Sequence, residues 1–228
     1  MFGKNPPRPQ ELNDGQQLWV QDVFYTLQGE GPFTGHPSVF VRLAGCNLAC
    51  TWCDTEFESS TWRPSLDELL TNIREKPQAD LVVLTGGEPF RQNIRPLIEA
   101  LLAQGKRVQI ETNGVLWVDL PHHPNLFIVC SPKTKNLHKD ILPRITAYKY
   151  VLAAGEVDPK DGLPNTNTQK QNQPIRIARP HGNTPIYVQP RDDLNPAKNK
   201  NNQQTCVDVA LRHRYRLTLQ THKVIGVD

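Results

Sequence analysis

Residues 45–57 read GCNLACTWCDTEF, and they place three of the chain's five cysteines within eight positions. Cys46, Cys50 and Cys53 follow a C-x3-C-x2-C spacing directly after the predicted strand 38–45. A loop this short can direct three thiolates at one centre. In a reducing compartment, clustered cysteines are more often metal ligands or catalysts than disulfides. The stretch therefore predicts a metal centre at the carboxyl end of a strand.

The number of cysteines narrows the kind of metal centre. A structural zinc site takes four protein ligands. The remaining cysteines, Cys130 and Cys206, are distant in the sequence, and the nearest histidine, His36, precedes the strand. Three thiolates match a four-iron cluster, which takes one cysteine per iron and leaves one iron open to an outside ligand. A zinc site and a redox dithiol formed by Cys50 and Cys53 are the alternatives.

Length and charge limit the class of protein. The 228 residues suit one core domain over 16–228, preceded by a flexible extension over 1–15 that is rich in proline, asparagine and charge. The formal net charge of +3 is weaker than the clustered excess of nucleic-acid-binding proteins. The N-terminus has no apolar signal-peptide core, and no apolar run approaches the roughly 20 residues of a membrane span. We expect a soluble cytoplasmic protein with no nucleic-acid or membrane partner.

Hydrophobic periodicity and turn residues predict an α/β fold. Helices are predicted from Ser65, where Glu68 completes a capping box, over 91–105, and into 210–213. Because strands alternate with helices, we expect right-handed βαβ units and a parallel sheet. The chain is shorter than the roughly 250 residues of an eightfold barrel, so we predict a partial (β/α) barrel of roughly six parallel strands with few helices. The predicted strands cover residues 17–26, 38–45, 81–87, 107–114, 126–133, 147–153, 185–190 and 215–220.

Polar residues follow several of these strands at their carboxyl ends. Parallel strands end at one edge of a sheet, where open α/β sheets and barrels place their active sites. We therefore expect one site at that edge, built from the residues after Cys46, from Thr85–Glu88, from Glu111–Asn113, from Ser131–Lys133 and from Gln189–Pro190.

Two motifs together resemble the radical S-adenosylmethionine (SAM) superfamily. The first is the C-x3-C-x2-C loop after an early strand, with the aromatic Trp52 beside its last cysteine. The second is the turn Gly86-Gly87-Glu88-Pro89, one βα unit further on, where glycine lets the backbone approach a ligand closely. In that superfamily the amino and carboxylate groups of SAM bind the open iron.

Longer stretches resemble one family within the superfamily, the 7-carboxy-7-deazaguanine synthases. The resemblance runs in order from about Gln21 to the end of the chain. It is carried by TLQGEGPFTGHPSVFVRLAGCNLACTWCDT (26–55), LTGGEP (84–89), IETNG (110–114), SPK (131–133), QP (189–190) and LQTHK (219–223).

The resemblance implies a reaction and its cofactors. The expected activity is that of a lyase that contracts 6-carboxy-5,6,7,8-tetrahydropterin to 7-carboxy-7-deazaguanine with loss of ammonia, a step in queuosine biosynthesis. A 5'-deoxyadenosyl radical would take hydrogen from C6, and SAM would be regenerated. The implied cofactors are a [4Fe-4S] cluster, SAM and Mg²⁺, and the implied partners are a second copy of the chain and flavodoxin or a similar electron donor. A radical SAM activase of a partner enzyme and a non-catalytic iron–sulfur and SAM-binding regulator are the alternatives.

The resemblance also implies the site residues. It assigns no acid–base side chain, because the cofactors carry the radical chemistry. The cluster would be held by Cys46, Cys50 and Cys53, and Mg²⁺ by Thr55. Substrate would meet Leu27, Gln28, Gly29, Arg42 and Thr85. SAM would meet Trp52, Cys53, Asp54, Gly87, Ser131, Pro132, Lys133, Gln189, Pro190, Arg191 and Asp192.

Other notable positions are assigned no role in binding SAM or substrate. Glu88 and Glu111 are not expected to act as an acid–base pair, because the chemistry is radical-based. His222 is expected to form a structural hydrogen bond. The tail ends in Asp228, whereas an apolar residue is expected there from the family, so we assign that residue no role. The segment 156–174 has almost pure loop composition, and we expect either a docking surface for the reductant or a plain surface loop.

Overall fold

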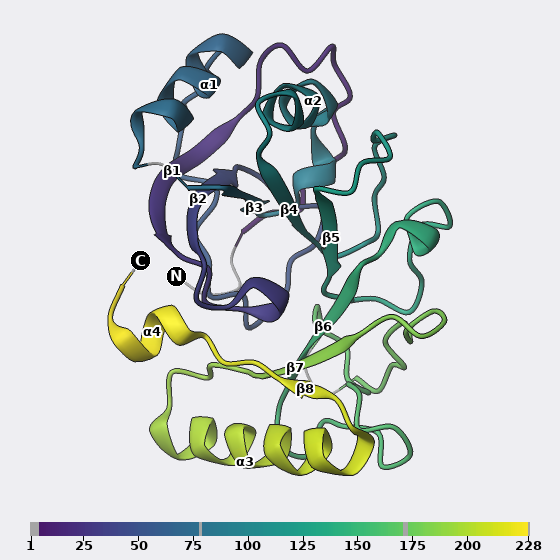
Figure 1. The fold of residues 1–228 in the computed structure, drawn as a ribbon. Coiled ribbons are helices and arrows are strands. Elements are labelled where there is room, and N and C mark those ends of the chain that lie inside the picture. Colours follow the sequence, from purple (N-terminus) through teal and green to yellow (C-terminus); the bar gives the residue numbers. More distant parts are fainter. Residues whose placement is uncertain (1–4, 78, 171–172, 228) are drawn as a thin grey trace.

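One curved sheet organises the protein, whose computed structural model describes residues 5–77, 79–170 and 173–227. The sheet has eight strands in sequential order (Figure 1). They are β1 (Val20–Leu27), β2 (Pro37–Leu43), β3 (Leu81–Gly86), β4 (Arg107–Thr112), β5 (Leu126–Cys130), β6 (Ala147–Leu152), β7 (Ile186–Pro190) and β8 (Arg216–Leu217). The helices are α1 (Leu66–Glu75), α2 (Arg95–Ala103), α3 (Pro196–His213) and α4 (Thr221–Ile225), with short 3₁₀ turns at Gly31–Phe33, Pro89–Arg91 and Leu142–Arg144.

The sheet forms the expected partial barrel, with one strand reversed. Every neighbouring pair from β2 to β8 is parallel, which makes seven parallel strands among the described residues where roughly six were expected. Strand β1 runs antiparallel to β2. The short connection between β1 and β2 allows only this direction, since a parallel pair needs a crossover of a dozen residues or more.

The two edges of the barrel meet through the segments that follow β1 and β8. The Gly31 N–H donates to the Thr218 hydroxyl at 2.9 Å, and the Thr221 N–H donates to the Gly29 carbonyl at 3.1 Å. Helix α4 therefore lies beside the turn after β1, at the open side of the barrel (Figure 1).

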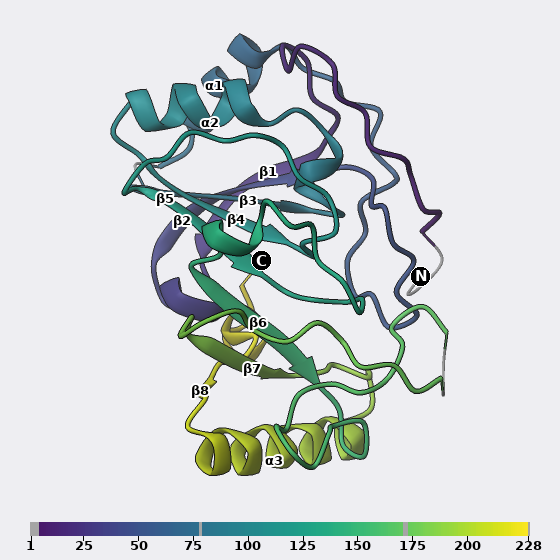
Figure 2. The ribbon, with the colours of Figure 1, turned by 90° about the vertical axis from the view of Figure 1, so that its right-hand side faces the viewer.

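Helices cover the outer face of the sheet at two places. Helices α1 and α2 lie together at one end of the molecule and α3 lies at the other, as two views show (Figures 1 and 2). Side chains alternate along each strand, so Val82 and Leu84 of β3 join the core under the helices, whereas Thr85 lines the interior cavity. Leu81 to Leu84 are all fully buried, as the apolar run predicted. No helix in the described part of the chain is long and apolar enough to cross a membrane.

The ends of several elements follow from their local sequence. The predicted capping box is confirmed: the Ser65 hydroxyl accepts from the Glu68 N–H, and the Glu68 carboxylate accepts from the Ser65 N–H at 2.8 Å. The prediction of a helix from residue 91 is wrong. Residues 89–91 instead form a 3₁₀ turn, and α2 begins at Arg95, where Pro96 suits the first helical turn.

The last predicted strand is also shorter than expected. The pattern 215–220 predicted six residues, but β8 pairs with β7 only at Arg216 and Leu217. Arg214 ends α3 in the left-handed conformation, and the chain turns into α4 at Thr221. Only a few residues therefore remain to form a strand between these two helices.

Residues 5–15, within the predicted extension, lie against the barrel. The Arg8 N–H donates to the Cys46 carbonyl at 2.6 Å. The Gln10 side chain bridges the carbonyls of Phe90 and Trp117 at 2.8 and 2.9 Å. The fully buried Arg91 pairs with the Glu11 carboxylate at 3.2 Å. The segment thus contacts the cysteine loop directly, while the flexibility expected for 1–15 stays a prediction.

Candidate active site

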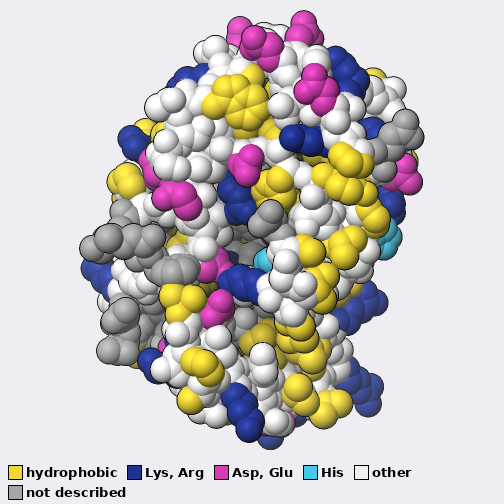
Figure 3. Space-filling view, turned by 90° about the vertical axis from the view of Figure 1, so that its left-hand side faces the viewer, with side chains coloured by type: hydrophobic (Ala, Val, Ile, Leu, Met, Phe, Trp, Pro, Cys, Tyr) yellow, Lys and Arg dark blue, Asp and Glu magenta, His cyan; other side chains and the backbone are white. Residues whose placement is uncertain are grey.

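A cavity of about 520 Å³ occupies the interior of the barrel and opens at its incomplete side. It is lined by residues of β1 to β4, β6 and β7, and by the segment after β5, the cysteine loop and the C-terminal segment. Charged groups of both signs and a histidine gather at the middle of the face that carries α4 (Figure 3). The volume suits a drug-sized ligand, or a cofactor together with a small substrate.

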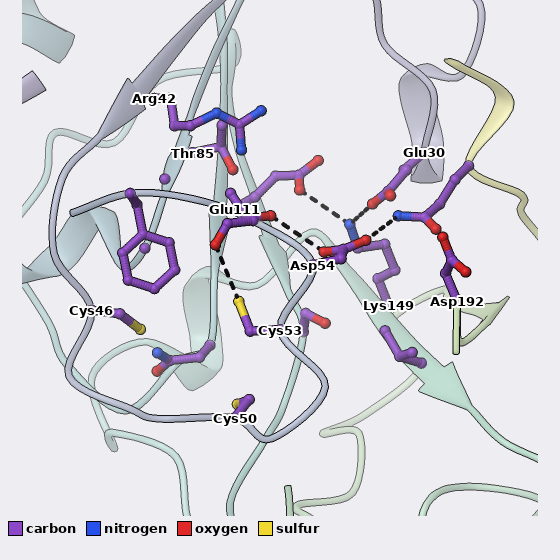
Figure 4. A pocket seen from close by; sticks show the side chains of 18 of the residues that line it. Glu30, Arg42, Cys46, Cys50, Cys53, Asp54, Thr85, Glu111, Lys149 and Asp192 are labelled. Carbon is purple, nitrogen blue, oxygen red and sulfur yellow. Dashed lines mark hydrogen bonds and ion pairs between the residues drawn. The ribbon is translucent and has the colours of Figure 1, made fainter. Parts of the chain in front are cut away.

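The three loop cysteines lie at one end of this cavity (Figure 4). Cys46 is buried, whereas Cys50 and Cys53 are partly exposed. Burial raises the pKa of the Cys46 thiol to about 12, and it also raises the pKa values of Cys50 and Cys53. Burial thus outweighs the attraction of Lys133 for Cys50 and Cys53, and bound metal would supply further charge to stabilise the thiolates.

Glycines let the cysteine loop lie against the next strand. A Cβ at Gly87 would lie 2.1 Å from the Gly45 carbonyl oxygen, and Gly45 itself has a φ of +79°. The Glu88 N–H donates to the same Gly45 carbonyl at 3.0 Å. The GGE turn and the cysteine loop are therefore packed backbone against backbone, which a side chain at Gly87 would prevent.

The donor set fits an iron–sulfur cluster better than a single metal ion. Among residues 5–77, 79–170 and 173–227, no group of three Cys, His, Asp or Glu side chains converges closely enough to hold one ion. A cluster binds each cysteine to a different iron, so its thiolates need not converge on one atom. Three soft thiolates around one end of a cavity suit that arrangement and disfavour the zinc alternative.

Most residues that the sequence assigned to SAM or substrate line the same cavity. The exceptions are Pro132, which lines a neighbouring pocket of about 20 Å³, and Gly29, which lies under His222. A Cβ at Gly29 would lie 2.1 Å from the His222 Nδ1. The assigned residues that do line the cavity are Cys46, Cys50, Cys53, Trp52, Asp54, Thr55, Gly87, Ser131, Lys133, Gln189, Pro190, Arg191, Asp192, Leu27, Gln28, Arg42 and Thr85.

Two of the acidic residues assigned to SAM are bound by the C-terminal helix. Lys223 Nζ lies 2.7 Å from the Asp54 carboxylate and 2.9 Å from that of Asp192. Gln220 Nε2 also donates to Asp54 at 3.0 Å. Desolvation opposes ionisation of Asp54, but the hydrogen bonds from Lys223 and Gln220 outweigh it and lower its pKa. Asp54 therefore joins the cysteine loop to α4.

Arg191, also assigned to SAM, is held by carboxylates from two segments. It makes two hydrogen bonds of 3.0 Å to Glu156 and one of 2.8 Å to Asp193. Lys133 lies under Trp52, with its Nζ 5.6 Å from the ring centre, and donates to the Ser131 carbonyl at 2.8 Å. Desolvation lowers the pKa of Lys133.

The opposite end of the cavity holds a buried ionic network (Figure 4). Lys149 Nζ donates to the Glu30 carboxylate and, at 3.1 Å, to the Glu111 carboxylate. Gln28 Nε2 donates to Glu111 at 3.0 Å, and Gln189 Nε2 donates to Glu30 at 3.0 Å. Desolvation alone would lower the pKa of Lys149, but attraction to Glu111 and Glu30 raises it instead. The lysine is therefore held as a cation.

One acceptor of this network has no partner in the described structure. The Gln189 side chain is 4% exposed, and its Oε1 makes no hydrogen bond there. Buried polar atoms are paired in most proteins, so this oxygen indicates a place for a ligand donor.

Arg42 points into the cavity between the two ends. It lies opposite Thr85 in the parallel pair of β2 and β3, and its guanidinium stands 5.4 Å from the Phe24 ring centre. Desolvation lowers the pKa of Arg42, and the described residues include no carboxylate in an ion pair with it. Its planar fork is suited to a carboxylate of a ligand.

Glu88 has a structural environment rather than a catalytic one. It is fully buried and accepts from the Thr112 hydroxyl and the Asn113 N–H at 2.7 Å each and from the Phe90 N–H at 3.0 Å. Burial raises its pKa to about 7. Its carboxyl fixes the turn after β3 to the end of β4, which is consistent with assigning it no acid–base role.

Sequence reasoning missed several residues of the cavity. Glu30 stands within the quoted LQGEG motif, and Lys149 is the only charged residue in the strand sequence AYKYVL, which was the available signal for a buried ion. Glu111 was expected at the same edge of the sheet, but it was given no role in binding and was rejected as an acid or base. Other lining residues that were given no ligand-binding role include Asn5, Phe24, Phe40, Gln220, His222 and Lys223.

Comparisons with known proteins agree with this geometry. Residues 41–122 match the model of the Radical SAM superfamily. The chain is 56% identical over its full length to the whole 7-carboxy-7-deazaguanine synthase of Rhodospirillum rubrum. It is 40% identical over its full length to 96% of the synthase of Rickettsia prowazekii. The crystal structure of QueE from Escherichia coli superposes with a TM-score of 0.67 at 27% identity, covering 91% of this chain and 97% of that one.

Proposed function

This chain belongs to the 7-carboxy-7-deazaguanine synthase family of radical SAM enzymes, and we propose that its cavity carries out the ring contraction of that family. The reaction converts 6-carboxy-5,6,7,8-tetrahydropterin to 7-carboxy-7-deazaguanine with loss of ammonia, on the route to queuosine. The observation that carries the proposal is the arrangement of one cavity with three thiols at one end and a buried network of Glu30, Lys149 and Glu111 at the other.

The cysteine end holds the cofactors. Cys46, Cys50 and Cys53 would bind three irons of a four-iron cluster. When bound, the cluster and SAM supply the radical that removes a hydrogen atom from C6 of the substrate. Trp52, Lys133 and Gly87 line the cavity together with the cysteines.

The ionic end would recognise the pterin ring. A pterin presents an amino group and a ring N–H beside a carbonyl oxygen, so it needs acceptors and one donor in a row. The Glu30 and Glu111 carboxylates and the unpartnered Gln189 Oε1 are acceptors, and Lys149 is a donor. Lys149 forms ion pairs with both carboxylates, and although desolvation opposes ionisation of Glu30, its attraction to Lys149 lowers the Glu30 pKa. The ring would thus be oriented with C6 toward the cysteine end.

Arg42 and Thr55 would hold the substrate carboxylate. Arg42 has a planar guanidinium with two parallel donors, which fits a carboxylate in a bidentate manner. Thr55, two residues after the last cysteine, lines the same cavity, and its hydroxyl lies 3.3 Å from an Asp54 carboxylate oxygen. A hard oxygen of this kind suits Mg²⁺, which takes its remaining ligands from substrate and water.

Family membership also supports proposals about partners. We infer a homodimer, a cytoplasmic location, and flavodoxin or a similar protein as electron donor. The segment 156–174 remains a candidate docking surface for that donor. Footprinting this segment with and without flavodoxin tests the idea, and unchanged protection would exclude it. Asp228 lies outside the described residues.

One anaerobic experiment tests the proposed reaction. The cluster is reconstituted, and 6-carboxytetrahydropterin, SAM, Mg²⁺ and dithionite are added while product mass and SAM are followed together. We expect 7-carboxy-7-deazaguanine with SAM largely conserved. Cleavage of SAM to 5'-deoxyadenosine without this product would overturn the substrate. A loaded cluster with no SAM cleavage would favour a regulator that binds the cofactors without turnover.

A further inference from the structure

The long connection between β6 and β7 folds back on itself instead of forming an open loop. Isolated antiparallel bridges join Val157 to Pro164 and Thr166 to Pro174. The Thr166 hydroxyl donates to the Glu156 carboxylate at 2.6 Å. These contacts give the segment a defined shape, although its composition is that of a loop.

Both ends of this connection are tied to the barrel. The Glu156 carboxylate that holds Thr166 also binds Arg191, directly after β7, through two hydrogen bonds of 3.0 Å. Further along, the Ala178 N–H donates to the Thr134 carbonyl at 2.8 Å. These anchors hold the described residues between them, which include Thr168.

Thr168, between the anchors, makes three contacts with the cysteine loop. Its hydroxyl oxygen lies 3.4 Å from the Cys50 sulfur. Its carbonyl accepts from the Thr51 N–H at 2.8 Å and from the Thr51 hydroxyl at 3.3 Å. Thr168 is 6% exposed, although it stands 118 residues from Cys50 in the sequence. One buried residue therefore fixes both the sulfur of a cluster ligand and the backbone next to it.

The hydroxyl of Thr168 has two possible acceptors. While Cys50 is a thiol, its S–H can donate to Thr168, whose own proton then goes to the Lys133 carbonyl at 3.1 Å. Once Cys50 is a thiolate, the sulfur is a charged acceptor, and hydrogen bonds to charged acceptors are the stronger ones. In the described residues, no other side-chain hydroxyl lies within hydrogen-bonding distance of a sulfur of Cys46, Cys50 or Cys53.

We propose that the Thr168 hydroxyl donates to the Cys50 thiolate when the cluster is bound and thereby raises the reduction potential of the cluster. Reduction adds one electron, from an outside donor, to a group that already carries negative charge. A hydrogen bond to a ligating sulfur offsets that charge and so favours the reduced state. The proposal rests on the proposed function, because it requires the four-iron cluster.

The test compares reduction potentials of variants that differ by one hydroxyl. Thr168→Val keeps the shape of the side chain and removes the donor, whereas Thr168→Ser keeps the donor. Each protein is reconstituted without SAM or substrate, and the cluster potential is measured by a redox titration followed by electron paramagnetic resonance. We expect Thr168→Val to reduce the ratio of reduced to oxidised cluster at a fixed potential by about tenfold, which is about 59 mV for a one-electron couple. Thr168→Ser is expected to retain the wild-type potential.

Thr166→Val is the matched control. It makes the same chemical change in the same connection, but the hydroxyl it removes binds Glu156 and no sulfur. It should titrate as the wild type does. An unchanged potential in Thr168→Val at wild-type iron content would overturn the proposal, as would an equal shift in Thr166→Val.

A second pair of variants and a Raman measurement distinguish a missing hydrogen bond from a variant that binds no cluster. Should Thr168→Val take up no iron, Thr168→Ala against Thr168→Ser carries the same comparison. In the wild-type protein, the iron–sulfur stretching bands in a Raman spectrum should shift on transfer to heavy water, and part of that shift should vanish without the Thr168 hydroxyl. A shift that is identical with and without the hydroxyl excludes the hydrogen bond. A wild-type protein that forms no cluster would instead reject the proposed function.

Discussion

The cysteine end of the cavity comes from eight consecutive positions, whereas the ionic end is assembled from distant parts of the chain. Cys46, Cys50 and Cys53 belong to one loop. Lys149, by contrast, is 119 residues from Glu30 and 38 from Glu111. A local motif is sufficient for binding a cluster, but recognition of a flat ring requires groups from several strands around the barrel.

The two ends also differ in how their charges are satisfied. At the cysteine end, burial raises the pKa of each thiol, so those groups depend on metal to become anions. At the ionic end, the Lys149 cation already stabilises two carboxylates. The comparison predicts that the first end fails by losing its metal, and the second by losing stability and substrate binding.

The largest effect is expected from changes at the cysteine end. Cys50→Ala should abolish both cluster binding and product formation, because two thiolates cannot replace three around a four-iron cluster. Iron and sulfide content, visible absorption and SAM cleavage measure the loss. Cys130→Ala and Cys206→Ala are the controls, since both thiols are buried away from the cavity. Wild-type iron content in Cys50→Ala would contradict the assignment of the ligands.

The next effect tests the ionic end. Lys149→Met leaves Glu30 and Glu111 buried without a cation, and removing one partner from a buried ion pair typically costs about 3–5 kcal/mol in the free energy of unfolding. Chemical denaturation measures that loss. Pterin turnover should disappear while the reconstituted variant keeps its iron, because the cysteine loop is untouched.

Two further variants test whether the loss of stability comes from the unpaired carboxylates. Lys135→Met changes an exposed lysine and should match the wild type in stability and turnover. Combining Lys149→Met with Glu30→Gln removes one of the stranded carboxylates, so part of the lost stability should return. A single Lys149→Met variant with wild-type stability would show that the buried network does not behave as an ion pair.

The same contrast, between one local motif and groups from distant strands, explains which site residues the sequence could predict. The spacing of Cys46, Cys50 and Cys53 and the glycines after β3 are local signals, and the structure brings them together as expected. Lys149 gave only the weak signal of one charge in an apolar strand, because its partners are set by barrel closure. Thr168 gave no signal, since a threonine in a loop of polar residues has no distinctive pattern.

The features of the fold can likewise be divided into those that neighbouring residues determine and those that depend on other segments of the chain. The apolar run of β3 and the capping box of α1 depend on neighbouring residues, and both were predicted correctly. The reversed direction of β1 follows from its short connection to β2, and the short β8 follows from where α3 ends and α4 begins; hydrophobic periodicity reports neither. The folded connection around Thr166 is held by Glu156 and by strand-like bridges whose residues have no strand pattern in sequence.

Arg42 lies between the two ends, and its change should have a moderate effect. Arg42→Lys keeps the charge but loses the two parallel donors that suit a carboxylate. One charge-assisted hydrogen bond contributes about 1.5–3 kcal/mol, so KM for the pterin should rise about tenfold to a hundredfold. Steady-state kinetics measure KM, and SAM cleavage without substrate should stay unchanged.

The control for Arg42 is an arginine on another strand of the sheet. Arg107→Lys changes a residue of β4 whose guanidinium lies 5.4 Å from the Phe33 ring centre and which does not line the cavity. Its KM should remain at the wild-type value. An Arg42→Lys enzyme with unchanged KM, or an equal rise in Arg107→Lys, would remove Arg42 from the proposed substrate site.

Glu88 offers the sharpest comparison with Glu30, because it is a buried carboxyl held by hydrogen bonds, and no cation of the described residues forms an ion pair with it. Burial raises its pKa from an ordinary value near 4.5 to about 7. The folded state therefore binds its proton more tightly than the unfolded state does. The stability from this group is fully present below about pH 4.5 and is lost as the pH rises to about 7, by about 3 kcal/mol in all.

Glu88→Gln should remove this part of the pH dependence, as measured by denaturation of the metal-free protein between pH 5 and pH 8. It should also lower stability at pH 5 by about 1–3 kcal/mol, because the amide NH₂ must face either the Asn113 or the Phe90 N–H and leaves that donor unpaired. The two curves should therefore converge at high pH. Glu75→Gln, an exposed change, should follow the wild-type curve throughout. A wild-type protein whose stability stays level or rises from pH 5 to pH 7 relative to Glu88→Gln would mean that the hydrogen bonds from Thr112, Asn113 and Phe90 keep this buried carboxylate ionised.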